Sequence, residues 1–202
     1  CSSDLIVISP IFGLVLGYIL MVCTLWIMRD SSPQRADKHF RRLQLFSAAA
    51  YSIGHGTNDA QKTMGIIAGV LFTAGMLPEF SIPFWIVLMA HAAIGIGTLW
   101  GGWRIVKTMG MQITKLKPIG GFCAETAAAC SLFGTALAGI PVSTTQTIAG
   151  AIMGAGSVQR FSAVRWGIAR RIVWAWLLTI PISGGVAALA FWIISKLFPA
   201  AL

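Results

Sequence analysis

Long apolar stretches constrain this chain more than any other feature of its sequence. Four stretches rich in apolar residues cover residues 5–28, 43–103, 119–157 and 168–198. A helix needs about 20 apolar residues to cross the hydrocarbon core of a bilayer. Only 10% of the residues are charged, whereas a soluble domain averages about 25%. Because lipid offers no hydrogen bonds to an open backbone, the sequence predicts an all-α, polytopic membrane protein.

The basic residues lie between the apolar stretches. The formal net charge is +9, and thirteen of the fifteen Lys and Arg fall within residues 29–42, 104–117 and 160–171. Basic loops of this kind are typical of the cytoplasmic side of a membrane protein. A nucleic-acid interface would instead need basic and aromatic side chains on one soluble surface, so we expect no nucleic-acid partner. We predict a multi-pass protein of the cell membrane, a bacterial inner membrane, with Glu79 in an outer loop.

Two of the apolar stretches are interrupted by polar residues. Residues 43–103 form a broken segment followed by a span, with the break at residues 54–62, and residues 119–157 are broken at residues 139–145. We expect residues 119–157 to cross and return, or to form a re-entrant hairpin. A break in a membrane helix is tolerated only against protein or a water-filled cavity. Paired breaks therefore indicate the substrate site of a transporter.

The first break contains an ionisable side chain at membrane depth. Gly54 and Gly56 permit a sharp bend, and Asn58 and Asp59 follow them. Ionisable residues inside a membrane are costly and are functional candidates by default. The alternative for Asp59 is a structural ion pair with Lys62, one helical turn away. His55 either titrates near neutral pH or braces the loop.

The second break resembles the start of a helix. Pro141 is followed by Ser143, Thr144 and Thr145, and proline and hydroxyl residues favour the first turn of a helix. A half-helix that begins inside the membrane would offer its free N–H groups and the positive end of its dipole to an anion. The alternative is ordinary capping of a surface helix.

Glu125 is the other buried carboxylate that we expect. It lies among small residues, which let helices approach closely, so it binds a coupling cation or makes structural hydrogen bonds. His and Cys lack metal-ligand spacing, and the sequence has no arrangement of a nucleophile with a base. We therefore expect no enzyme, no bound metal and no cofactor other than the coupling cation.

Residues at both breaks resemble a known signature. Residues 54–65 (GHGTNDAQKTMG), 121–125 (GFCAE) and 141–145 (PVSTT) are similar to the inorganic phosphate transporter (PiT) family, over roughly residues 42–171. The resemblance implies one half of an inverted-repeat symporter, here the C-terminal half, with the N-terminal half and a second copy in a homodimer as partners. By motif, Asn58, Asp59, Ser143, Thr144 and Thr145 would contact phosphate or its coupling ion, and Glu125 would help to hold that ion. Gln146 departs from the His of many members.

These features predict secondary active transport of inorganic phosphate, coupled to H⁺ or Na⁺. Two like charges about 4 Å apart repel by roughly 4 kcal/mol at an effective dielectric of 20, so an anion beside Asp59 needs a proton or a cation. Phosphate carries a proton that it can share with a carboxylate, and sulfate does not. The alternatives are a metal-phosphate complex as cargo, a sulfate or other oxyanion permease of the same fold, and a channel-like or structural membrane subunit.

Overall fold

The protein is all-α, as predicted. The computed structural model describes the backbone of residues 2–140 and 142–197, and the side chains of these residues except 2–6, 104 and 105. No strand occurs in this described part. The elements are α1 (Ser2–Ile27), α2 (Pro33–Thr73), α3 (Phe84–Lys107), a π-helical turn η1 (Thr108–Gln112), α4 (Pro118–Leu137), α5 (Thr144–Ser157), a 3-10 turn η2 (Phe161–Ala163) and α6 (Trp166–Leu197).

Three of these helices are long and apolar enough to cross a bilayer. They contain Val7–Ile27, Phe84–Trp103 and Trp166–Leu197. The chain divides into two compact units, and the first unit ends at Val164. Helix α6 belongs to the second unit and is a single helix from Trp166 to Leu197.

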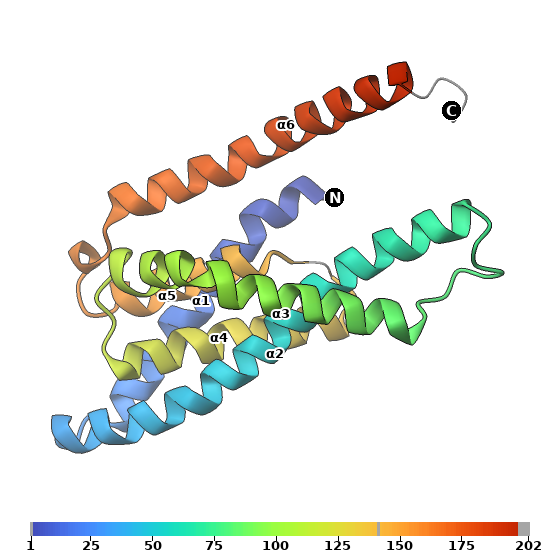
Figure 1. Ribbon diagram of the computed structural model, residues 1–202. Coiled ribbons are helices and arrows are strands. Elements are labelled where there is room, and N and C mark those ends of the chain that lie inside the picture. The colour runs from blue at the N-terminus through green and yellow to red at the C-terminus, as the bar shows by residue number, and fades with distance from the viewer. Residues whose placement is uncertain (1, 141, 198–202) are drawn as a thin grey trace. The chain divides into compact units, whose positions relative to one another are not determined.

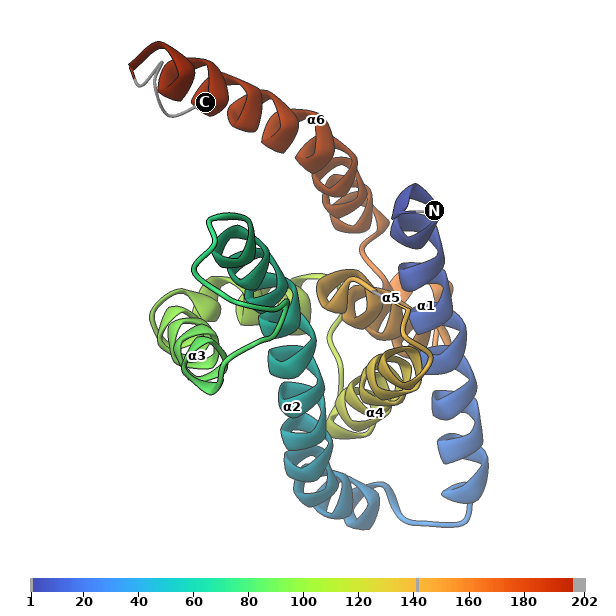
Figure 2. The same cartoon turned by 90° about the vertical axis from the view of Figure 1, so that its right-hand side faces the viewer.

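The first unit is built around the pair α4 and α5. Helix α1 packs against both of them, α2 packs against α4, and α3 packs against α2. Figure 2 shows α4 between α1 and α2, with α3 on the outer side of α2. Apolar side chains of α2 and α3, namely Ala60, Met64, Ile86 and Ala90, form a buried cluster between these two helices.

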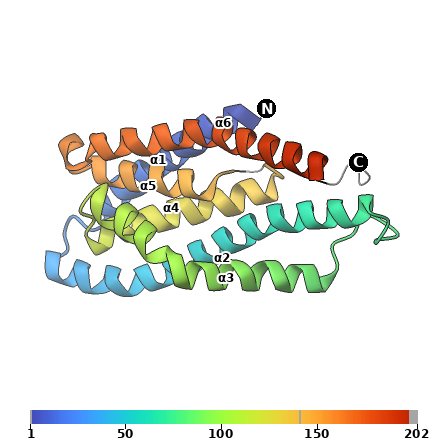
Figure 3. The same ribbon diagram turned by 45° about the horizontal axis from the view of Figure 1, so that its top comes forward.

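The basic loops of the first unit lie at one end of the bundle. The α1–α2 connection with Arg29, the η1–α4 connection with Lys115 and Lys117, and the segment after α5 with Arg160 all lie at the left in Figures 1 and 3. The α2–α3 loop with Glu79 lies at the opposite end. This arrangement agrees with the predicted separation of basic loops from Glu79.

Helix α2 is unbroken, so the first predicted interruption is wrong. The helix runs through residues 54–62 without an interruption. Among the described residues, positive φ angles occur only at Gly75 and Gly139. A glycine permits a bend but does not impose one, and an intact helix keeps every backbone N–H and C=O bonded inside the membrane. Gly54 therefore stays helical and is buried against Leu132 and Phe133 of α4.

The second predicted interruption is present between α4 and α5. Helix α4 ends at Leu137 and Gly139 has φ +67°. The Ile140 N–H donates to Thr135 O at 2.9 Å, and the Gly139 N–H donates to Ala136 O at 3.1 Å. These two bonds are those of a Schellman motif. The chain then reverses, and α5 starts at Thr144, with Ser143 at the N-cap position. The predicted role of Pro141 lies outside the described residues.

The hairpin of α4 and α5 is shorter than α2. The Val142 carbonyl, just before α5, lies level with Lys62, and α2 continues for eleven residues beyond that point. Figure 3 shows α4 and α5 side by side, with α2 extending past their shared turn. Helix α5 has 14 residues, fewer than the roughly 20 that a crossing needs. This geometry favours the re-entrant hairpin over two crossings.

Four glycines bring α1 and α5 into close contact. Gly13 and Gly17 of α1 face Gly150 and Gly154 of α5, and a Cβ atom at any of the four would collide with the backbone of the other helix. For example, a Cβ atom at Gly17 would lie 2.9 Å from the Ala151 Cα. Small residues at four-residue spacing allow such packing in membranes. The contact holds α5, and therefore the start of α5, in a fixed position.

Candidate functional site

Asp59 meets the start of α5. The Thr144 hydroxyl donates to the Asp59 carboxylate, with its Oγ1 3.3 Å from Oδ1 and 3.2 Å from Oδ2. Thr144 is only 2% exposed. The first N–H groups of a helix have no partner within that helix, and the positive end of the helix dipole favours a nearby negative charge. The start of α5 therefore stabilises a carboxylate or another anion at this position.

This contact lies near the middle of the apolar part of α2. Asp59 is 16 residues from Leu43 and 14 residues from Thr73, which corresponds to about 24 Å and about 21 Å along a helix. The two polar segments that the sequence singled out are thus brought together beside the middle of this part of α2. They meet on an intact helix α2 rather than between two breaks.

Lys62 connects the same two elements. Its Nζ lies 3.2 Å from Asp59 Oδ1 and donates to Val142 O at 3.1 Å. The ion pair considered as the structural alternative for Asp59 is therefore present. Its additional bond to the segment before α5 places a positive charge where the two elements meet.

His55 lies on the other side of the Asp59 carboxylate. Its Nδ1 is 3.3 Å from Asp59 Oδ2, and this buried nitrogen has no hydrogen-bond partner among the described residues. The imidazole stacks on the Tyr51 ring, with 5.8 Å between ring centroids and 9° between ring planes. His55 thus lies beside the carboxylate, one turn before Asp59 on α2.

Asn58 lines an open hollow beside this cluster. The hollow has a volume of about 330 Å³, and its lining also includes Lys62 and the turn between α4 and α5. The complete lining is Asn58, Gln61, Lys62, Ala136, Gly139 and Ile140. Amide groups and an ammonium group are suitable partners for an oxyanion. Gln61 is a lining residue that was not selected from the sequence.

The other predicted residues of the second break have different environments. Ser143 is half-buried, and its carbonyl accepts from the N–H and the hydroxyl of Thr147 at 3.0 and 2.8 Å. Thr145 is exposed and Gln146 is buried, and the Gln146 Oε1 has no hydrogen-bond partner among the described residues. Of the three consecutive hydroxyl residues, only Thr144 has a described bond to Asp59. Consecutive helical residues point in different directions, and this explains the separation.

Glu125 forms a separate cluster. Its Oε2 accepts from the Ser47 hydroxyl at 2.6 Å, and its Oε1 accepts from the Gln44 amide at 3.4 Å. Ser47 and Asp59 are 12 residues apart on α2, which is about 18 Å along the axis. One cation cannot contact both carboxylates in this conformation.

A polar stripe on α2 joins the two clusters. Residues 44, 47, 51, 55, 59 and 62 recur at spacings of three or four, which places them on one face of a helix. Gln44, Ser47 and Tyr51 were missed because the segment was interpreted as an apolar helix followed by a break. The helical period of its polar residues is the signal that would have identified them.

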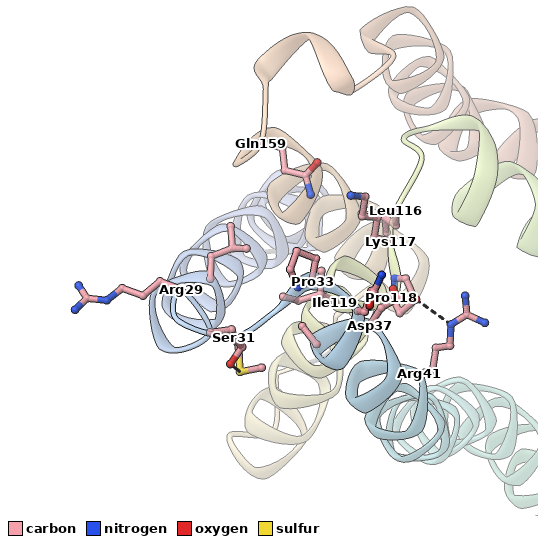
Figure 4. A pocket seen from close by; sticks show the side chains of 14 residues that line it. Arg29, Ser31, Pro33, Asp37, Arg41, Leu116, Lys117, Pro118, Ile119 and Gln159 are labelled. Atoms are coloured by element: carbon pink, nitrogen blue, oxygen red, sulfur yellow. Dashed lines mark hydrogen bonds and ion pairs between the residues drawn. The ribbon is translucent and has the colours of Figure 1, made fainter.

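A larger hollow lies away from both carboxylates. It has a volume of about 870 Å³ and lies among the connections at the basic end of the bundle. Figure 4 shows the ion pair that Arg41 Nε makes with Asp37 Oδ2 there at 3.2 Å, and it shows the Arg29 side chain pointing away. None of the predicted site residues lines this hollow.

Comparison with known proteins identifies the family. Residues 28–187 match the model of the phosphate transporter family. Two proteins described as probable low-affinity inorganic phosphate transporters are 54% identical over 191 residues (Rhizobium meliloti) and 41% identical over 196 residues (Bacillus subtilis). These matches cover 94% and 96% of this chain, and 57% and 59% of the respective relatives.

A solved structure has the same fold. The sodium-dependent phosphate transporter superposes with a TM-score of 0.73 at 22% identity, over 96% of this chain and 57% of that protein. The present chain therefore spans somewhat more than half the length of the proteins that it resembles. The predicted relationship is confirmed: this chain, an all-α, multi-pass membrane protein, belongs to the phosphate transporter family.

Proposed function

We propose that the chain forms one half of a cation-coupled transporter of inorganic phosphate in a bacterial cell membrane. The observation that carries this proposal is the contact between Asp59 and Thr144 at the start of α5, beside a hollow lined by Asn58 and Lys62. The family and the names of the relatives support phosphate as the cargo. The rest of the transporter supplies the other half of the phosphate site, as the N-terminal repeat, and the complete protein is a homodimer.

The proposed mechanism of coupling rests on Lys62. Its ammonium group lies 3.2 Å from the Asp59 carboxylate, so an anion in the hollow meets a positive charge that is already paired. A proton or a Na⁺ ion on Asp59 replaces Lys62 as the partner of this carboxylate. Lys62 then becomes free to bind phosphate, and the repulsion of roughly 4 kcal/mol between two close negative charges is removed. Cation and anion thereby promote the binding of each other.

The remaining residues have roles that follow from their positions. Asn58 contributes an amide, and the first turn of α5, from Ser143 to Thr145, contributes N–H groups and hydroxyls. The oxygen of Gln146, which lacks a partner among the described residues, is an acceptor close to the same turn. Glu125 binds a second cation, because its partner Ser47 lies about 18 Å from Asp59 along α2. Phosphate is favoured over sulfate because its own proton can bond to a carboxylate.

The test is uptake of radiolabelled phosphate into liposomes that contain the full-length protein, with Na⁺ and pH gradients imposed separately. We expect Asp59→Asn to lose accumulation driven by a cation gradient and to retain exchange of phosphate for phosphate, because a neutral side chain leaves Lys62 free. Glu79→Gln, which changes a carboxylate in the loop at the opposite end of the bundle, serves as the control. Gradient-driven accumulation by Asp59→Asn would contradict the proposal.

Competition experiments in the same liposomes separate the alternatives. Excess sulfate that inhibits uptake as strongly as phosphate would favour a general oxyanion permease. Uptake that requires a divalent metal would favour a metal-phosphate cargo. Flux that never saturates with phosphate would favour a channel-like subunit. Because the solved relative is described as sodium-dependent, Na⁺ is the first cation to test.

A further inference from the structure

The hollow beside Glu125 leads from the basic end of the bundle toward the Asp59 cluster. It has a volume of about 330 Å³ and its polar lining comes from Gln44, Tyr51, Lys117 and Glu125. Leu116, Lys117 and Pro118 bound it on the side of the basic loops, and Tyr51 bounds it farther along α2. The π-helical turn η1 contributes Met109 and Gly110. The hollow thus extends along the polar stripe of α2.

Tyr51 is the residue shared by this hollow and the Asp59 cluster. Its ring lines the hollow and stacks on His55, whose Nδ1 lies 3.3 Å from Asp59 Oδ2. The three side chains follow one another at intervals of four residues on the same face of α2. A particle that moved from Glu125 to Asp59 along this face would have to pass the Tyr51 ring.

The charge and walls of the hollow favour a cation. Glu125 is a carboxylate, and apolar side chains supply most of the remaining lining: Val106, Met109, Leu116, Pro118, Ala124, Ile148 and Ile152. A low-dielectric wall strengthens the field of a nearby charge. Lys117 is exposed and belongs to the connection at the basic end, so its positive charge lies at the entrance. Gln44 and Ser47 orient the carboxylate, and each carboxylate oxygen can accept further bonds.

We propose that the hollow beside Glu125 is the route by which a monovalent coupling cation passes between Asp59 and the side of the basic loops, and that the Tyr51 ring is the barrier on this route. The proposal rests on the proposed function, since it describes how the cation reaches the same site. Tyr51 blocks the passage of the cation when phosphate is absent. The hollow beside Glu125 and the hollow at Asn58 share no lining residue.

The first test measures access to the hollow and does not depend on transport. In the full-length protein, Met109→Cys is treated with positively and negatively charged methanethiosulfonate reagents that do not cross membranes, and the reaction beyond that of the native cysteines is recorded. The rate of reaction with each reagent is divided by the rate at which the same reagent reacts with free cysteine in solution, so that the two reagents can be compared. We expect reaction from the side of the basic loops, with a preference of about tenfold for the positive reagent. Glu125→Gln in the same background should remove this preference.

The second test measures cation flux without phosphate in liposomes. Radiolabelled Na⁺ and an internal pH-sensitive dye report the two candidate cations. We expect Tyr51→Ala to raise this flux severalfold and to lower the number of phosphate ions accumulated per cation. Tyr51→Phe should retain the wild-type ratio because it keeps the ring. Tyr18→Ala is the matched control, since Tyr18, the only other tyrosine, is exposed on α1.

The two tests give separate outcomes for the two proposals. Equal normalised rates for both reagents, reaction only from the opposite side, or an unchanged phosphate-to-cation ratio in Tyr51→Ala would overturn the proposed route. Wild-type protein without cation-driven phosphate uptake would instead contradict the proposed function. If Tyr51→Ala fails to fold, the thiol measurement decides alone.

Discussion

At the scale of single residues, most contacts of the candidate site converge on Asp59. Lys62, Thr144 and His55 approach its two oxygens within 3.2 to 3.3 Å, from two different helices. A carboxylate at membrane depth is unfavourable unless it is paired. The lysine and the start of α5 supply that compensation, and the hollow beside them leaves room for a ligand.

The bond from Thr144 to Asp59 can be tested by an isosteric change. Thr144→Val removes the hydroxyl and leaves the shape of the buried side chain nearly unchanged. A hydrogen bond to a charged group contributes about 1.5–3 kcal/mol, so we expect an increase of about ten- to a hundredfold in the phosphate concentration for half-maximal uptake. Thr63→Val changes an exposed threonine of α2 in the same way and should have no effect. Equal uptake curves for the two variants would exclude this role of Thr144.

At the scale of elements, a continuous α2 lies beside a re-entrant hairpin. The start of α5 is held in place from two sides: glycine contacts fix the helix against α1, and Lys62 binds the segment that precedes it. The Schellman motif at Gly139 reverses the chain in front of α5. The helix start therefore has a defined position with respect to Asp59.

Two alanine substitutions distinguish the two kinds of glycine. Gly54 has helical geometry, and a Cβ atom there would lie 3.5 Å from the Leu132 Cβ, an ordinary contact. Alanine is more favourable than glycine inside a helix by roughly 1 kcal/mol, so we expect Gly54→Ala to preserve or raise the thermal unfolding midpoint. Gly139→Ala should lower it, because a left-handed conformation costs a residue with a side chain roughly 1–2 kcal/mol.

The readout is the unfolding temperature of the full-length protein in detergent, measured by intrinsic tryptophan fluorescence. If Gly54→Ala unfolded the protein and Gly139→Ala did not, this result would contradict the statement that α2 is continuous through Gly54.

The sequence predicted one of the two interruptions correctly and the other wrongly, and both contain glycine. Apolar stretches and basic loops were sufficient to predict the all-α fold, and the interruption at residues 139–145 was predicted from its proline and its hydroxyl residues. The pair Gly54 and Gly56 was misinterpreted, because a glycine next to polar residues occurs in both a break and an intact helix. Only the packing of α2 against α4 decides between the two.

The site was predicted in part. Asp59, Thr144, Lys62 and His55 do come together, whereas their roles in binding phosphate and the coupling ion remain predictions. The separation of Glu125 from Asp59 depends on the register of α2 against α4, which no local pattern in the sequence contains. Gln44, Ser47 and Tyr51 became visible as a group only once α2 was known to be continuous.

At the scale of the whole molecule, the ends of the first unit differ in charge. The basic connections lie at one end and the loop with Glu79 at the other (Figure 1). Basic loops remain on the cytoplasmic side during membrane insertion. We therefore predict that the hairpin of α4 and α5 enters the membrane from the cytoplasmic side.

This orientation predicts which residues can be labelled from each side. In the full-length protein, we expect a membrane-impermeant maleimide to react with Glu79→Cys in intact cells, and with Gln34→Cys only in inverted vesicles. Glu79 lies in the α2–α3 loop, and Gln34 lies in the first turn of α2, beside the α1–α2 connection. The unsubstituted protein gives the background reaction of the native cysteines. The opposite pattern would reverse the assigned sides.

The central claim is that phosphate binds where an unbroken α2 meets the start of α5, and an electron cryo-microscopy map of the full-length protein with phosphate tests it most directly. We expect α2 to be helical through Gly54 and Asp59, with anion density within hydrogen-bonding distance of Asn58 or Lys62 and of the first turn of α5. A map in which α2 unwinds at these glycines, or in which phosphate binds away from Thr144, would contradict the claim.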